Sequence, residues 1–571
     1  MLSILVLGCT LDYTRKNIYA DVAEQPDSIL LLSKSSLLRD RLLAQGCCPN
    51  QVAMLQQTLS PATMYYAYRT DALEHRKDHS RCSEQQCLVD NVDERTYITQ
   101  HQKDFCDGTC ESVAFPMVKA RAIIDGGGYP IISVAPPVQP LDEPDVEVVE
   151  ALPEIPYLAI SHVWADGLGN PHHNSLPRCQ MIYLRAKVRD CMYDTTGKGA
   201  HLHNGRLHFW IDTVCVPLQQ PHRGKAIKLM AQTYTAATRV LVLDRQVRDL
   251  TWTEPFSEKR YEEHMIKITC CAWLRRLWTF QEGVLAKRLY FQCADGACEV
   301  GVWVLQHVRD PARALWHIVG AEVVNFHLLM RRLRRTDGAE RVAHVWAALQ
   351  WRATSRRADE LICVAAPPDR RMDAFLDLQQ LFPPGIVFAS GPRLDRPGRR
   401  WAPASFMASQ PYDYAVMDSE SMPAYFDQRG LYVTYPGMRL TVPHSPVVAQ
   451  CLMLVDEAER SCFQLQRVDV DGDSASPDRQ IDTKRVLMLV LHRLPDGTQT
   501  EIRGILVEGQ DTGDGECLHV EYWCNVSLVQ EPEESWEHNF SMFSEECNKE
   551  FDEYLFARCP MLDFQQQWCI G

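Results

Sequence analysis

The feature that most constrains the fold is an alternation of apolar runs and helix-length amphipathic segments between residues 157 and 292. Apolar runs predict buried strands at 157–164, 209–216, 240–244 and 288–292. Apolar residues at helical spacing predict helices at 176–193, at 223–238 and around the sequence LWTFQE. Because strands joined by helical crossovers run parallel, we expect an α/β fold with a parallel sheet covered on both faces.

The rest of the chain is expected to form separate parts. We predict an N-terminal region over 1–150, the α/β domain over 151–300, a helical extension over 301–370 and a β-rich C-terminal region over 371–571. The proline-rich, acidic stretch 134–156 shows no helical or strand period and is interpreted as a linker. Short apolar runs between turn signals after residue 430 favour an antiparallel β module.

Charge and hydropathy restrict the partners. The 571-residue chain carries a formal net charge of −15, which argues against a nucleic-acid partner. No stretch approaches 18 uncharged apolar residues, so no membrane span is expected. The short apolar run near the start is interpreted as a strand and not as a signal peptide. We therefore predict a cytoplasmic protein, in which the 22 cysteines stay reduced and clustered ones are candidate metal ligands.

Polar residues follow the predicted strands at the edge where parallel α/β sheets bind ligands. After the first strand come Ser161, His162 and Trp164, and then a loop with Asp166, Gly167 and Gly169 whose N–H groups are expected to face an anion. Asp212 and Cys215 end the second strand. Structural roles stay open: hydrogen bonds to a neighbouring loop or a helix cap, turns at the glycines, and simple burial of the Cys215 thiol.

Glu282 is unusual, because it lies at the edge of the apolar stripe in LWTFQEGVLA, four residues after Trp278. Ser161, Asp212 and Glu282 are expected to open onto the same cleft. A structural explanation of Glu282 is an ion pair with Arg275 or Arg276 that only holds the fold together.

Histidines and cysteines cluster in the N-terminal region. His79, Cys82 and Cys87 are spaced H-x2-C-x4-C, and His101, Cys106 and Cys110 repeat these types as H-x4-C-x3-C. Zinc takes four such ligands, so two short knuckles brought together would supply one site. The candidate ligands are Cys82, Cys87, His101, Cys106 and Cys110, and free thiols with surface histidines are the alternative. The run 468–478 contains oxygen ligands in the manner of a calcium loop but is interpreted as a hairpin turn.

Three blocks in order carry a family resemblance. They are YLAISHVWADGLGN, then FWIDTVCVP with AQTYTAATRVLVLD, then RRLWTFQEGVLA, over about residues 157–295. They resemble the signature blocks of the fungal heterokaryon incompatibility (HET) domain, and SHVWADGLGN and RWAPASFM are similar to the version in mushroom-forming fungi. Where many members read ID-x-x-C-I-N-Q, this chain has Val216 to Gln219 in place of the asparagine motif.

The resemblance implies a small parallel, flavodoxin-like sheet related to Toll/interleukin-receptor (TIR) domains, and a role in programmed cell death after fusion of incompatible cells. Plant TIR domains that cleave NAD carry a tryptophan four residues before the catalytic glutamate, as Trp278 and Glu282 do here. The resemblance therefore implies that Glu282, with Asp212 and Ser161, forms the catalytic group, in which the carboxylate would stabilise the positive charge that develops as the glycosidic bond breaks. NAD is then the candidate substrate, with no cofactor required and zinc as the candidate metal. The candidate nucleotide-binding residues are His162, Trp164, Asp166, Gly167, Gly169, Cys215, Arg276 and Trp278.

Three functions remain open at this point. One is an enzyme that cleaves NAD or a related nucleotide. Another is a non-catalytic module that associates with itself or with an incompatibility partner. The last is a HET-like fold recruited to make a small molecule, using the pocket but not Glu282.

Overall fold

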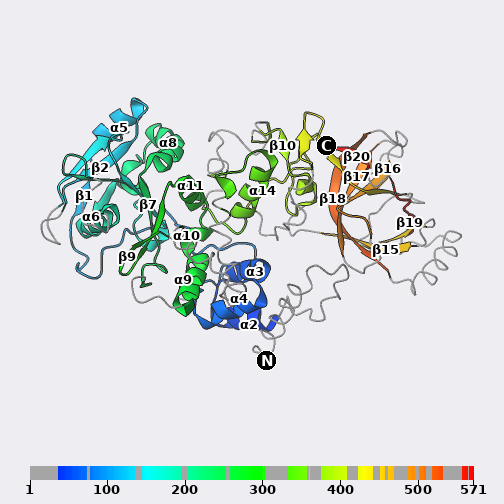
Figure 1. The fold of residues 1–571 in the computed structure, drawn as a ribbon, viewed down its shortest axis with the longest axis horizontal. Coiled ribbons are helices and arrows are strands. Elements are labelled where there is room, and N and C mark those ends of the chain that lie inside the picture. The colour runs from blue at the N-terminus through cyan, green and yellow to red at the C-terminus, as the bar shows by residue number, and fades with distance from the viewer. Residues whose placement is uncertain are drawn as a thin grey trace. The chain divides into compact units, whose positions relative to one another are not determined.

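A computed structural model gives the fold of the chain (Figure 1). The residues that it describes are 36–73, 77–136, 144–193, 202–251, 258–299, 301, 329, 332–355, 359–360, 375–377, 379–407, 422–440, 451–456, 461–468, 486–495, 501–509, 517–531, 556–562 and 565–571. They belong to two compact units. The first comprises residues up to 335 together with 351–371, and the second comprises 336–350 together with 372–571.

A seven-stranded sheet forms the centre of the first unit, in the order β3-β2-β6-β4-β7-β8-β9. Its strands are β2 (Pro130–Val134), β3 (Val146–Glu150), β4 (Leu158–His162), β6 (Leu207–Trp210), β7 (Arg239–Leu243), β8 (Leu289–Cys293) and β9 (Gly296–Cys298). The pairs β6-β4, β4-β7 and β7-β8 are parallel, whereas β2, β3 and β9 join antiparallel. The α/β fold is thus confirmed, but the sheet is mixed and not purely parallel.

Two details of the predicted organisation were wrong. The stretch 134–156, interpreted as a linker, contains the edge strand β3, in which only Val148 is fully buried. The strand predicted over 209–216 ends at Trp210, and the helical turn α7 (Asp212–Cys215) follows it. Asp212 is the first residue of this turn and accepts a hydrogen bond from the Thr213 N–H at 2.7 Å.

Helices cover the sheet. They are α5 (Met117–Asp125), α6 (Arg178–Met192), α8 (His222–Ala236), α9 (Glu258–Cys270), α10 (Ala272–Arg275) and α11 (Leu277–Leu285). The crossover from β4 to β6 runs one way along the sheet and that from β6 to β7 runs the other way, so the order reverses at β4. Helices α8 and α11 pack side by side (Figure 1). Ligands of α/β proteins bind beyond the strand carboxyl ends at such a reversal.

The N-terminal helices build a second core in the same unit. They are α2 (Ser36–Ala44), α3 (Pro49–Thr58) and α4 (Pro61–Arg69). Their apolar residues pack with α9, α10 and the β7–β8 side of the sheet, where Trp273 is fully buried. From Lys77 to Glu111 the chain forms only turns and bends, and then the pair β1 (Ser112–Ala114) and β5 (Ser175–Pro177) precedes α6.

The second unit is rich in β-strands, and its sheet is mostly antiparallel, with two parallel pairs that involve its last two strands. Helix α14 (Gly338–Leu349) belongs to it, with an eleven-stranded sheet. Its strands are β10 (Leu381–Phe382), β11 (Ala424–Phe426), β12 (Leu431–Thr434), β13 (Gly437–Leu440), β14 (Cys451–Asp456), β15 (Ser461–Arg467), β16 (Val486–Leu491), β17 (Ile502–Gly509), β18 (Leu518–Gln530), β19 (Phe556–Arg558) and β20 (Gln567–Ile570).

Some predictions concern residues outside the described part of the chain. These are the N-terminal strand, most of the helical extension 301–370, and the calcium-like run beyond residue 468. Within the described residues, no helix has the length and hydropathy needed to cross a bilayer.

Candidate functional site

A pocket of about 190 Å³ lies at the carboxyl ends of β4 and β6. Its lining combines acidic, cationic, aromatic and apolar side chains. The lining residues are Val92, Glu94, His162, Val163, Trp164, Asp212, Thr213, Val216, Pro217, Leu218, Arg223, Ile227, Met230, Arg276, Trp278, Thr279, Glu282, Ser355 and Asp359. Six of the predicted site residues are among them: His162, Trp164, Asp212, Arg276, Trp278 and Glu282.

Asp212 is a fixed anion in this pocket. His162 Nε2 lies 2.8 Å from Asp212 Oδ1, and the Trp164 indole N–H donates to Oδ2 at 2.7 Å. Although burial disfavours the carboxylate, His162 and Trp164 hold the pKa of Asp212 below its usual range. Burial likewise favours the neutral imidazole, but Asp212 raises the pKa of His162. The two groups therefore stabilise each other as an ion pair.

Glu282 has a different environment. It is buried on α11, where it accepts a hydrogen bond from the Ser161 hydroxyl and another from Tyr234 on α8. Burial, with a contribution from Asp212, raises the pKa of Glu282 from its ordinary value of 4.5 to about 7, although both hydroxyls oppose the rise. Among the carboxyl groups of the pocket, Asp212 thus stays ionised, whereas Glu282 exchanges a proton near neutral pH.

The arginines do not pair with Glu282. Arg275 contacts Asp90 at 3.3 Å, and Arg276 donates to Asn91 Oδ1 at 2.8 Å. Within the described residues, no lysine or arginine forms an ion pair with Glu282, so the alternative ion pair proposed from the sequence was wrong. Their acceptors come from residues that are distant in the sequence and that the tertiary fold brings next to the two arginines.

Ser161 lies behind the pocket. Its side chain is fully buried, donates to Glu282 and accepts a hydrogen bond from the Trp273 indole N–H at 2.5 Å. It is not part of the pocket lining. Its geometry suits a residue that orients Glu282, not one that touches a ligand.

The loop after β4 does not present its N–H groups to the pocket. The Gly167 N–H donates to the Trp164 carbonyl at 2.9 Å, and the Gly169 N–H donates to the Tyr97 hydroxyl at 3.0 Å. Asp166 accepts from the Arg245 N–H at 3.1 Å and lies 3.8 Å from Lys77. The loop after β4 therefore does not form the expected anion-binding site. Its N–H groups and the Asp166 carboxylate bond to other parts of the protein instead.

Cys215 is buried in the core below the pocket, where burial raises the pKa of its thiol to about 12. It does not line the pocket. Its environment is that of a small apolar residue.

Four contributors to the site were missed from the sequence. Tyr234 and Trp273 complete the hydrogen bonds around Glu282 and Ser161. Tyr234 stands in the block AQTYTAATRVLVLD, where its apolar neighbours made it look like a core residue. Arg223 lines the pocket, and within the described residues its side chain has no hydrogen-bond or ion-pair partner. Glu94 comes from a segment without regular structure, so no periodicity marks it.

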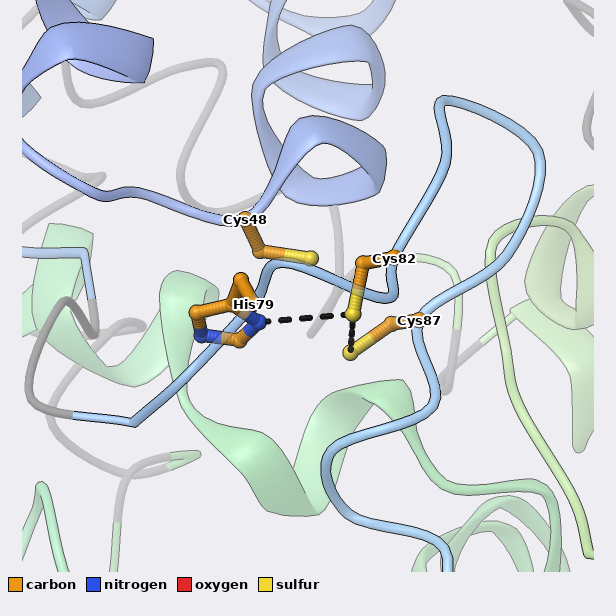
Figure 2. A group of neighbouring side chains, drawn as sticks. All are labelled: Cys48, His79, Cys82 and Cys87. Atoms are coloured by element: carbon orange, nitrogen blue, oxygen red, sulfur yellow. Dashed lines mark hydrogen bonds between the residues drawn. The ribbon is translucent and has the colours of Figure 1, made fainter.

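The cysteines and histidines of the N-terminal region form two groups, each of which can hold a metal ion such as zinc. One is Cys48, His79, Cys82 and Cys87 (Figure 2), and the other is His101, Cys106, Cys110 and Cys179. The prediction that both knuckles supply one shared site was therefore wrong, although three of the predicted ligands, His101, Cys106 and Cys110, do converge, as do Cys82 and Cys87. Each knuckle is completed by its own distant cysteine, Cys48 or Cys179.

Residues 157–251 match the family model described as Heterokaryon incompatibility protein (HET). The matched span contains β4, the following loop, Asp212 and Tyr234, and it ends before α11, which carries Glu282. No curated protein and no solved structure matches the chain. The likeness to the version in mushroom-forming fungi, and the kinship with TIR domains, stay predictions from the sequence.

Proposed function

We propose that this chain, which is a HET-domain protein related to heterokaryon incompatibility, hydrolyses the glycosidic bond between nicotinamide and ribose in NAD or a related nucleotide. The observation that carries the proposal is the pair of unlike carboxyl groups in one pocket: Asp212, held ionised by His162, and Glu282, which is buried and forms no ion pair with a lysine or arginine among the described residues. Such a difference between two neighbouring carboxyl groups is typical of acid–base sites.

The reaction uses these groups without a metal. As the bond between ribose C1′ and the nicotinamide nitrogen breaks, its electron pair leaves with the neutral nicotinamide and positive charge grows on the ribose. Ionised Glu282 stabilises that charge and then accepts the proton of the water that adds to C1′. Ser161 and Tyr234 hold Glu282 in place through their hydroxyl groups.

The remaining lining suits a nucleotide. Trp164 and Trp278 offer aromatic faces for a base or a nicotinamide ring, and Arg223 offers a guanidinium for the pyrophosphate. The Trp278 indole N–H is bound to Asp359 at 2.9 Å, which fixes the ring at the pocket edge. We place this reaction in the cytoplasm, as a step in cell-death signalling.

The test is to incubate the purified full-length chain with NAD and to follow free nicotinamide by chromatography. Trp278→Phe serves as the binding variant, because loss of the indole N–H frees the ring from Asp359 and should raise KM more than it lowers kcat.

Release of nicotinamide that depends on enzyme concentration supports the proposal. Tight binding of NAD without release would instead favour the non-catalytic module. Neither binding nor release would favour the recruited small-molecule enzyme, because Val216, Leu218, Ile227 and Met230 make one side of the pocket apolar.

A further inference from the structure

We infer that the two cysteine–histidine groups are structural zinc sites that fasten residues 88–100, here called the wall segment, over the pocket. The first group, the Cys48 site, ends just before the wall segment at Cys87, and the second, the Cys179 site, begins just after it at His101. The inference goes beyond the proposed hydrolysis, since metal content and the order of the wall segment can be measured without any turnover.

The distances between the side chains fit one tetrahedral ion in each group. With Zn–S near 2.3 Å and Zn–N near 2.0–2.1 Å, tetrahedral geometry places sulfur and nitrogen about 3.6 Å apart and two sulfurs about 3.8 Å apart. In the Cys48 site, Cys82 Sγ lies 3.6 Å from His79 Nδ1 and 4.0 Å from Cys87 Sγ (Figure 2). In the Cys179 site, Cys106 Sγ and Cys179 Sγ each lie 3.6 Å from His101 Nδ1, and Cys110 Sγ lies 3.2 Å from it.

Backbone N–H groups point at the sulfurs, as thiolate ligands require. The Leu88 N–H donates to Cys82 Sγ at 3.4 Å, the Gly108 N–H to Cys106 Sγ at 3.4 Å, and the Gln102 N–H to Cys179 Sγ at 3.2 Å. Gly108 has a φ of +89°, so the turn between Cys106 and Cys110 needs glycine there. These contacts orient the ligands and tune their charge.

The surroundings of the Cys48 site balance the charge of a bound ion. Three thiolates and one neutral histidine around Zn²⁺ carry a formal charge of 2 − 3 = −1. The Arg275 guanidinium, which is buried, lies 3.7 Å from Cys87 Sγ. Cys48, His79 and Cys87 are themselves buried. A cation beside a buried anionic metal centre offsets its desolvation.

The wall segment needs such fasteners. It contains no helix or strand, and most of its residues are exposed or half-buried. Yet Val92 and Glu94 line the pocket, and Tyr97 donates to the Trp164 carbonyl at 2.5 Å. The Gln100 N–H donates to the Gly167 carbonyl at 2.9 Å. A stretch that buries so little apolar surface holds one conformation only when its ends are fixed.

The fourth ligands show what each site ties together. Cys48 directly precedes α3, so the first site joins the N-terminal helices to the start of the wall segment. Cys179 lies in the first turn of α6, so the second site joins the end of the wall segment to a helix that follows β4. Removing either ion should therefore free one end of the segment.

The experiment measures metal in the full-length chain purified under reducing conditions. Elemental analysis should find two zinc ions per chain, and cobalt substitution should give the visible absorption of tetrahedral thiolate coordination. Cys48→Ser and Cys179→Ser should each retain one ion. The matched controls are Cys47→Ser, next to Cys48, and Cys191→Ser, on the same helix as Cys179, and both should retain two ions. Hydrogen exchange in residues 88–100 should rise when a chelator removes the metal.

Several results would overturn the inference. Folded wild-type chain that contains no zinc, or contains iron instead, excludes the two sites even if every variant fails to fold. Unchanged zinc content in Cys48→Ser or Cys179→Ser would show that the groups are not the ligands. Exchange in residues 88–100 that does not respond to metal removal would contradict the fastening of the wall segment.

Discussion

The pocket has two sides built in different ways. On one side, Ser161 and His162 are the last residues of β4 and Asp212 follows β6, and both strands are buried and paired on both edges. On the other side, the wall segment has no regular structure and is held by single side-chain contacts, such as Arg276 with Asn91 and Tyr97 with Trp164. The chemical groups are on the first side, and the covering contacts are on the second.

The two sides of the pocket are therefore expected to have different roles. Groups that must keep their geometry to within a fraction of an ångström are best placed on strands and helices whose position is fixed by many packing contacts. A cover that buries little apolar surface depends on the few contacts that fix it, since local stability follows local burial. We therefore expect changes on the sheet side to affect chemistry, and changes in the wall segment to affect the stability and closure of the pocket.

The largest effect on stability should come from removing the ion pair between the wall segment and α10. Asp90 pairs with Arg275 at 3.3 Å and with Lys77 at 2.7 Å, and it is buried. Asp90→Ala leaves the buried Arg275 without its carboxylate, so the free energy of unfolding should fall by about 3–5 kcal/mol. Denaturant titration measures this. The control is Asp93→Ala, in the same segment but exposed and, in the part of the chain that the structure describes, paired with the exposed Arg95, which should leave the midpoint unchanged. Equal effects of both changes would contradict the distinction.

The next effect concerns pH and the sheet side. Burial raises the pKa of Glu282 to about 7 in the folded chain, so its proton is bound more tightly in the folded than in the unfolded state. The stability that this contributes is fully present below about pH 4.5 and is lost as pH rises towards 7. Glu282→Gln keeps the shape without the ionisation. The variant should match wild type near pH 5 and exceed it by about 3 kcal/mol at pH 8. Parallel stability curves for the two proteins would argue against the perturbed carboxyl group.

A smaller effect is expected where the two sides meet. A Cβ added at Gly169 would lie 2.7 Å from the ring of Trp164, which binds Asp212. Gly169→Ala should cost about 1–3 kcal/mol through overpacking and should change the tryptophan fluorescence. The control is Gly224→Ala on α8, where a Cβ meets only the end of the Gln220 side chain at 3.1 Å. That change should be neutral or slightly stabilising, because alanine favours a helix. Comparable losses of stability in both variants would show that the contact with Trp164 is not the cause.

The sheet side could largely be predicted from the sequence. Period and apolar runs located β4, α8, β7, α11 and β8 to within a few residues, since local pattern and tertiary burial agree there. The strand predicted over 209–216 was too long, because apolar residues continue through Val214 into the buried turn α7. The edge strand β3 was missed, because its valines stand among glutamates inside a proline-rich, acidic stretch.

The wall side could be predicted only in part. The spacing of His79, Cys82 and Cys87 identified a knuckle, but Cys48 lies far outside it and Cys179 lies far from Cys110. The tertiary fold brings these distant ligands together, and no local sequence pattern indicates them. The partners of Arg275 and Arg276 were missed for the same reason, as Asp90 and Asn91 are distant in sequence.

The most direct test of the central claim is the rate of nicotinamide release by Glu282→Gln relative to wild type, measured with the unfolding midpoint of the same samples. Glu299→Gln, which removes a surface carboxylate paired with Arg288, controls for the change in net charge. The account predicts a loss of at least about 100-fold in rate, or about 2.7 kcal/mol, with an unchanged or higher midpoint. An unchanged rate with a lower midpoint would contradict it and would make Glu282 a residue that only stabilises the fold.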